Sequence, residues 1–254
     1  MKVYKYRALN KNNIDSLKEN YFWASSKEEL NDPCECYYTT QSYEKVIKFT
    51  SKISPKSEKA TIDLSNSLNT VQKMSKSLGI FSLSKSYNIS SLWASYASNH
   101  TGICIEYDLE ELINKNKGFY QYFDVTYSNT PPDIEVEDFQ RMTLLEKMFG
   151  TKHHDWDKEQ EFRIICDKQG ENYHRSDAIR SIIFGLRTSE ESKYEVMELL
   201  ADRNIQFKQL VNDGKSYGFH TQDIVNTFDK KAKLNDYEED DFKNIVPDND
   251  YIKD

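Results

Sequence analysis

The sequence has little glycine and little cysteine, and each shortage excludes a class of site. Only eight of the 254 residues are glycine. No glycine-rich P-loop or Rossmann motif occurs, so any nucleotide is not held by such a loop. The four cysteines include one close pair, Cys34 and Cys36, which is spaced too tightly for the usual zinc knuckle. Cys104 and Cys166 lie in apolar runs, as buried free thiols do, and this usage predicts a reduced, cytoplasmic protein.

The sequence also lacks long apolar runs and an excess of positive charge. No stretch approaches the roughly 20 apolar residues of a membrane helix, and residues 1–7 do not form the apolar stretch of a secretory signal. Lys and Arg total 34 against 42 Asp and Glu, a formal charge of −8. This balance argues against binding nucleic acid through bulk charge, although a local basic groove stays open. The motifs H-E-x-x-H and G-x-S-x-G are also absent.

Aromatic residues supply the core material that a low aliphatic content lacks. There are 17 Tyr and 13 Phe, and each ring buries a large area. Short strand-like alternations are interspersed with short helical patterns, without a regular βαβ rhythm, which predicts an α+β fold with a mainly antiparallel sheet. We expect one domain over residues 1–228, with a helical insertion at about 41–78, and an acidic C-terminal tail over 229–254.

Three predicted strands carry polar residues on one side, where a simple core would place apolar ones. They span residues 2–9, 79–85 and 159–166. Within each strand the polar positions are two residues apart and therefore share a side. These positions are Lys5 and Arg7, then Ser82 and Ser84, and then Glu159, Glu161 and Arg163.

The order Arg7, then Ser82 and Ser84, then Glu161 resembles the Arg-Ser-Glu pattern of ADP-ribosyltransferases, which implies a split antiparallel sheet and NAD as co-substrate. By this resemblance Arg7 binds a phosphate of NAD and the serines order the nicotinamide pocket. Glu161 stabilises the oxocarbenium-like sugar as nicotinamide departs, and Glu159 orients the acceptor. The chemistry suits the residue types: Arg offers a bidentate fork to phosphate, and a carboxylate is an anion beside developing positive charge.

Three further residues are candidates for the walls of such a pocket. Trp93 and Tyr96 are three residues apart on one predicted helix and could stack on a base or on nicotinamide, but aromatic pairs at this spacing are more often core. His100 lies between that helix and a strand. It could bind ribose or phosphate or transfer a proton, and a hydrogen bond to a turn explains it equally well.

A longer string of motifs resembles a widespread bacterial family known only as a domain of unknown function. The similarity spans about residues 3–210, and members are similar to proteins found among phage-defence and toxin genes, a setting in which an antitoxin or an activating partner is expected. One departure is Cys34, where the family usually has Phe. The motifs, in order, are Tyr4-Lys5-Tyr6-Arg7, Asn31-Asp32-Pro33, Phe81-Ser82-Leu83-Ser84, Trp93-Ala94-Ser95-Tyr96, Asn99-His100-Thr101-Gly102-Ile103-Cys104-Ile105, and Trp156 with Glu159-Gln160-Glu161-Phe162-Arg163.

The polar strands are also compatible with simpler arrangements and with two further functions. Arg7 and Glu161 could form a cross-strand ion pair, or Glu161 could pair with Arg163, and neither requires a ligand. A module that binds a nucleotide without catalysis is the second hypothesis. The third is a metal-dependent nuclease, because Asp155 with Glu161-Phe162-Arg163 distantly resembles an Asp…Glu-x-Lys metal site, with Arg in place of Lys. We rank the transferase first, the binding module second and the nuclease third.

Overall fold

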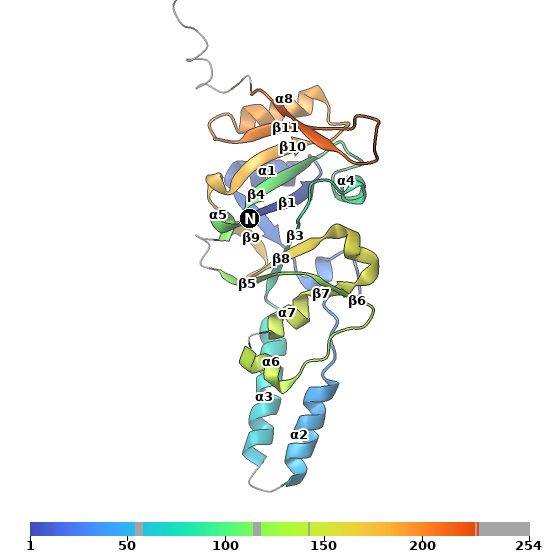
Figure 1. Cartoon of the computed structure of the whole chain (residues 1–254). Coiled ribbons are helices and arrows are strands. Elements are labelled where there is room, and N and C mark those ends of the chain that lie inside the picture. Colours follow the sequence, from blue (N-terminus) through green and yellow to red (C-terminus); the bar gives the residue numbers. More distant parts are fainter. Residues whose placement is uncertain (54–57, 114–117, 142, 227, 229–254) are drawn as a thin grey trace, which may run out of the picture.

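The computed structural model describes residues 1–53, 58–113, 118–141, 143–226 and 228, and the predicted acidic tail over 229–254 lies outside them. An eight-stranded sheet forms the centre of the chain (Figure 1). Its β10–β11 pair is parallel and its other pairs are antiparallel. The strands, in spatial order, are β12 (His220–Ile224), β11 (Gln206–Val211), β10 (Ile179–Phe184), β4 (Ile103–Asp108), β1 (Lys2–Arg7), β3 (Gly79–Ser84), β8 (Glu161–Cys166) and β5 (Phe119–Asp124).

Two small sheets and a set of short helices complete the fold. The small sheets pair β2 (Tyr21–Ala24) with β9 (Gly170–Tyr173), and β6 (Thr126–Ser128) with β7 (Thr151–His153). The α+β class with a mainly antiparallel sheet is therefore confirmed. The helices are α1 (Lys11–Glu19), α4 (Ser90–Tyr96), α5 (Leu109–Ile113), α6 (Val136–Arg141), α7 (Leu144–Phe149) and α8 (Glu190–Leu199), with 3-10 turns η1 (Lys27–Glu29), η3 (His154–Glu159) and η4 (Ser176–Ala178).

The segment predicted as a helical insertion holds two further helices, α2 (Gln41–Ile53) and α3 (Glu58–Ser75). They lie side by side and project away from the sheet (Figure 1). Phe49 and Ile62 remain largely exposed on them, and Tyr43 is buried at their base. None of the helices in the described ranges has both the length and the apolarity needed to cross a membrane.

The alternation of the strands places apolar side chains on both faces of the sheet. One face holds the largest core cluster, in which Val3, Phe81 and Phe162 pack with residues of α1, α5 and α8. On the other face α4 packs Leu92 and Trp93 over the centre of the sheet, and α7 covers its β3–β8 end. Both faces of the central strands are therefore buried, so a polar side chain on them must find a partner or a cleft.

The sheet opens between β1 and β3. β1 pairs with β4 over six residues, from Lys2 opposite Asp108 to Arg7 opposite Ile103. Against β3, the described register contains the single pair Tyr4 and Ser84. The ladder then resumes between β3 and β8, where Ser82 lies opposite Arg163 and Ser84 opposite Glu161. Beyond Tyr4, β1 therefore runs beside β3 without continuous pairing, and the space between them holds polar side chains.

Candidate functional site

A cleft of about 370 Å³ lies where β1 and β3 part, and we call it the central cleft. This volume is within the range of small-molecule sites. Residues from β1, β3 and the start of β8 line it together with α1, α4, β7 and the segment around η1. The polar lining residues are Tyr4, Lys5, Tyr6, Arg7, Asn10, Asn13, Glu29, Asn31, Glu35, Ser82, Ser84, Ser95, Tyr96, Lys152, Glu159 and Glu161.

The structure brings most of the predicted site residues together in this cleft: Arg7, Ser82, Ser84, Tyr96, Glu159 and Glu161. They do not share one face of the sheet. Ser84 lies opposite Tyr4 and Glu161, so these three share a face, whereas Arg7 is an odd number of residues from Tyr4 and lies on the other side of β1. The cleft unites them because β1 and β3 separate.

The β1 side of the cleft is cationic. Lys5 and Arg7 both line it, and the Lys5 ammonium donates a hydrogen bond to the carbonyl oxygen of Ser82 at 2.6 Å. Among the described residues, neither side chain has a carboxylate within ion-pair distance, and the Arg7 guanidinium, unlike that of Arg163, has no side-chain hydrogen bond. Burial lowers the pKa of Lys5 to about 7, and the nearby Arg7 adds to this effect. Burial lowers the pKa of Arg7 as well.

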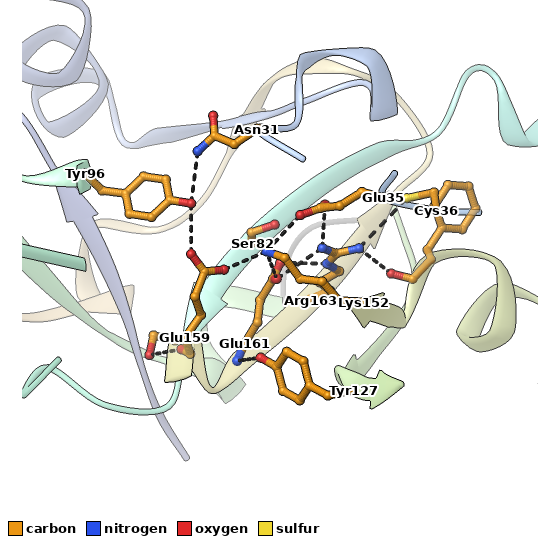
Figure 2. Close-up of polar contacts among 12 residues, drawn as sticks. Asn31, Glu35, Cys36, Ser82, Tyr96, Tyr127, Lys152, Glu159, Glu161 and Arg163 are labelled. Atoms are coloured by element: carbon orange, nitrogen blue, oxygen red, sulfur yellow. Dashed lines mark hydrogen bonds and ion pairs between the residues drawn. The ribbon is translucent and has the colours of Figure 1, made fainter. Parts of the chain in front are cut away.

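The opposite side of the cleft is acidic, and one lysine holds its three carboxylates together (Figure 2). The Lys152 ammonium lies 2.8 Å from Glu35, 2.6 Å from Glu159 and 3.0 Å from Glu161. It also lies 4.7 Å from the centre of the Trp156 ring, a cation–π contact. Burial alone would lower the pKa of Lys152, but the three carboxylates raise it well above its ordinary value. Lys152 is therefore a fixed positive charge.

Arg163 closes the floor of this acidic group. Its side chain is fully buried, and its Nε and Nη2 atoms donate to the two oxygens of Glu161 at 2.6 and 3.1 Å. Nη2 also donates to Glu35 at 2.7 Å, and Nη1 donates to the carbonyl oxygen of Phe149 at 2.6 Å. The ion pair of Glu161 with Arg163, one of the two pairings left open by the sequence, is thus present. We call Glu35, Glu159, Glu161, Lys152 and Arg163 the carboxylate cluster.

Glu161 is a permanent anion within the carboxylate cluster. Burial on its own would raise the pKa of this carboxyl, but Arg163, Lys152 and a hydrogen bond with the Ser82 side chain outweigh burial and lower the pKa to about 2. The hydroxyl of Ser84 donates to the backbone carbonyl of Glu159 at 2.8 Å, so this serine positions the chain that precedes β8. The two serines therefore support the acidic side of the cleft.

Glu159 is not in a strand, contrary to the prediction of a strand over 159–166. It ends η3, and β8 begins at Glu161. The intervening Gln160 is left-handed, with φ of 47°, which interrupts the alternation and turns the Glu159 side chain toward Tyr96. The hydroxyl of Tyr96 donates to Glu159 at 3.0 Å and accepts from the amide of Asn31 at 3.0 Å (Figure 2). Burial and Glu159 raise the pKa of Tyr96 to about 12, so it is a neutral donor.

Trp93 and His100 lie outside the central cleft, so the structure does not bring them to the predicted pocket. Trp93 is fully buried, packs edge-on against Tyr6, and donates its indole N–H to the carbonyl oxygen of Tyr87. His100 stacks on Trp93, with ring centres 5.8 Å apart. Trp93 follows the core interpretation that the sequence left open. For His100 the alternative was a hydrogen bond to a turn, but its Nδ1 atom is buried without a hydrogen-bond partner among the described residues.

The metal-site hypothesis gains no geometric support. Asp155 is exposed and contacts His153 rather than Glu161. Across the ranges that the structure describes, no group of three or more His, Cys, Asp and Glu side chains is arranged to hold a metal ion. The three glutamates of the carboxylate cluster surround the ammonium group of Lys152 instead.

Sequence reasoning missed Glu35 and Lys152 and assigned no role to Lys5. Glu35 lies two residues after the Asn31-Asp32-Pro33 motif, and no local spacing pointed to it. Lys152 lies in none of the motifs that the sequence singled out. A signal did exist for Lys5, because it shares the polar side of the first strand with Arg7.

The fold and the site define an α+β protein with a charged cleft in an opened sheet. Residues 92–164 match the family described as "Protein of unknown function (DUF2971)". The predicted resemblance to an uncharacterised family is confirmed over this segment, which includes Tyr96, Lys152, Glu159, Glu161 and Arg163. No curated protein and no solved structure matches the chain. The resemblance to ADP-ribosyltransferases finds no support in these comparisons and stays a prediction.

Proposed function

We propose that the protein is an ADP-ribosyltransferase-like enzyme that uses NAD as co-substrate. The observation that supports this function is the charge layout of the central cleft, with cations on one side and carboxylates on the other. NAD has the complementary layout during nicotinamide departure, because its pyrophosphate is anionic and its nicotinamide-bearing ribose develops positive charge.

The donor's pyrophosphate has a receptor on β1. Arg7 lines the cleft without an ion-pair partner among the described side chains, and its planar fork suits phosphate oxygens. The N-terminal end of α1 lies on the same side, since its N-cap Asn10 and the first-turn Asn13 both line the cleft. The positive end of the helix dipole adds to the attraction for an anion.

The reacting sugar belongs on the acidic side. The bond from C1′ of the ribose to the nicotinamide nitrogen breaks, and its electron pair leaves with nicotinamide, so positive charge develops on C1′ and the ring oxygen. Glu161 remains anionic at neutral pH and supplies the stabilising charge. An acceptor nucleophile then attacks C1′ and loses its proton, and Glu159 lies at the rim of the cluster to orient it. The acceptor molecule is a further partner of unassigned identity.

Nicotinamide release measures this function directly. Purified protein is incubated with NAD, and wild type is compared with Arg7→Met and Glu161→Gln. The exposed residues Arg187 and Glu195 supply matched controls, Arg187→Met and Glu195→Gln. We expect release from wild type and both controls and a loss of at least 100-fold in the two cleft variants. Circular dichroism must show each variant folded at the assay temperature. Release that is unchanged in folded Glu161→Gln contradicts the proposal.

We also propose that the protein is an effector among toxin or phage-defence proteins and acts on cytoplasmic NAD. This part of the proposal rests on the sequence resemblance alone. An antitoxin or activating partner belongs to the same expectation. Nicotinamide release that appears only on adding a lysate of the source cell would support such a partner.

A non-catalytic nucleotide-binding module is the second candidate, and one observation favours it. Both oxygens of Glu161 already accept hydrogen bonds from Arg163, and one also contacts Lys152. A carboxylate with these partners has less charge to offer to a sugar cation. This module predicts thermal stabilisation by NAD, about 3 kcal/mol at 100 times the dissociation constant, without nicotinamide release.

A further inference from the structure

We propose that Lys5 is a second anion ligand of the central cleft and that it takes up a proton when the anion binds. This inference deepens the proposed function and rests on it for the identity of the natural anion. Three observations support the inference: the cleft, an Arg7 that has no ion-pair partner among the described side chains, and the position of Lys5 beside it.

Lys5 is placed to share an anion with Arg7. The two residues are two positions apart on β1, point to the same side of the strand and line the same cleft. The Lys5 ammonium donates to the carbonyl oxygen of Ser82 at 2.6 Å and lies 5.2 Å from the centre of the Phe81 ring. An ammonium group has three donors, so at least one remains for a ligand. Arg7 adds its guanidinium from the same side, and together they form a two-cation clamp.

The charge around Lys5 keeps the empty clamp from being fully charged. Arg7 on its own strand and Lys152 on β7 repel a second positive charge. Glu161 on β8 and Glu159 on η3 oppose this repulsion, but the cations of the carboxylate cluster already neutralise them in part. Burial and Arg7 therefore prevail, and the pKa of Lys5 falls to about 7.

An anion between Lys5 and Arg7 reverses this balance. Negative charge within about 4 Å of an ammonium favours its protonated form, so the complex holds a proton that the empty protein at pH 8 or 9 lacks. Binding then follows the protonated fraction of the free amine, which is one half at pH 7 and about one hundredth at pH 9. The affinity should fall about 50-fold between these two pH values.

Calorimetric titration at pH 6, 7, 8 and 9 tests the inference with two probes. The first is NAD, whose phosphate diesters do not titrate in this range. The second is inorganic sulfate, which has the shape of a phosphate, keeps two negative charges throughout and contains no sugar or nicotinamide. At pH 8 the titrations are repeated in buffers of different ionisation enthalpy, because their difference in heat reports the protons taken up.

Wild type should bind both probes with an affinity that falls about 50-fold between pH 7 and 9 and with proton uptake at pH 8. The control Lys18→Met, which alters an exposed lysine of α1, should behave in the same way. Lys5→Arg should bind with little change between pH 6 and 9, because arginine stays charged. Lys5→Met should bind weakly at every pH. The arginine variant preserves a long cationic side chain, so it separates loss of the proton from loss of the fold.

The outcomes separate the two proposals. Sulfate binding with the expected pH profile, but no NAD binding or turnover, supports the clamp and contradicts the proposed function. A flat profile for wild type, with proton uptake near zero, overturns the proton-coupled clamp even if NAD is turned over. Binding of neither probe at any pH overturns both.

Discussion

The ion pair between Glu161 and Arg163 makes a quantitative prediction for Glu161→Gln. Both oxygens of the wild-type carboxylate accept hydrogen bonds from cations, from Arg163 on one and from Arg163 and Lys152 on the other. Glutamine has the same shape but replaces one oxygen with an NH₂ group. In either orientation that group faces a donor, so the variant loses a charge and gains a buried donor–donor contact.

Two routes give the magnitude of this loss. Removing one partner of a buried ion pair costs about 3–5 kcal/mol. Independently, moving a carboxyl pKa from 4.5 to about 2 corresponds to about 3 kcal/mol of folding free energy. We therefore expect Glu161→Gln to lower the free energy of unfolding at pH 7 by about 3–4 kcal/mol. For a chain of this size the melting temperature should fall by about 10 °C.

The pH dependence of this loss follows from the sign of the shift. Folding lowers the pKa of Glu161, so its contribution is complete above the unfolded value near 4.5 and disappears as pH falls through about 2. Urea unfolding of wild type and Glu161→Gln at pH 7, 5, 4 and 3 should show a gap that narrows below pH 5, with Glu195→Gln as the control. A gap smaller than 1 kcal/mol at pH 7, or one that is constant down to pH 3, would refute this reasoning.

Three further predictions test the placement of individual side chains. Trp93→Ala should destabilise the fold by about 3–5 kcal/mol, because the indole is fully buried. The NAD affinity of the folded fraction should stay within twofold of wild type, and a large loss of affinity in folded protein would place Trp93 in the site after all. Lys5→Met should stabilise the protein by about 4 kcal/mol more at pH 6 than at pH 10, because folding lowers the pKa of Lys5 from 10.5 to about 7 and unfolding therefore takes up a proton between these values. Urea unfolding at both pH values measures this difference, and equal effects at the two pH values would count against it. Tyr96→Phe removes the hydroxyl between Asn31 and Glu159, and should cost about 1 kcal/mol of stability in thermal melts, whereas a neutral effect would mean that the two contacts have no net value.

The strands that carry the site were predictable because their side chains alternate. Lys5 and Arg7, Ser82 and Ser84, and Glu161 and Arg163 occur at two-residue spacing among apolar neighbours, and this pattern persists in β1, β3 and β8. Their gathering in one cleft depends on the opening between β1 and β3. The alternation within β1 does not report where β3 separates from it. The sequence therefore predicted a cleft only through the resemblance to ADP-ribosyltransferases.

Several features of the site depend on contacts between distant segments. Glu35, Lys152 and Glu161 meet because three separate parts of the chain converge, and no local spacing reports this. Glu159 was predicted in a strand because a left-handed Gln160 leaves no mark in the polar pattern. Trp93 and Tyr96 are both aromatic residues of α4 and lie three positions apart. Trp93 packs into the core against the sheet, whereas Tyr96 lines the cleft.

Lys152 gives the three glutamates a counterion that is part of the polypeptide. A metal ion in that position would be lost to a chelator and replaced according to the ions in the medium. The ammonium group is tethered by its own backbone on β7, so its local concentration is set by the fold and does not change with dilution. The charge of this side of the cleft is consequently inherited with the sequence, and the codons of Lys152 and Arg163, rather than metal supply, control whether the glutamates can lie together.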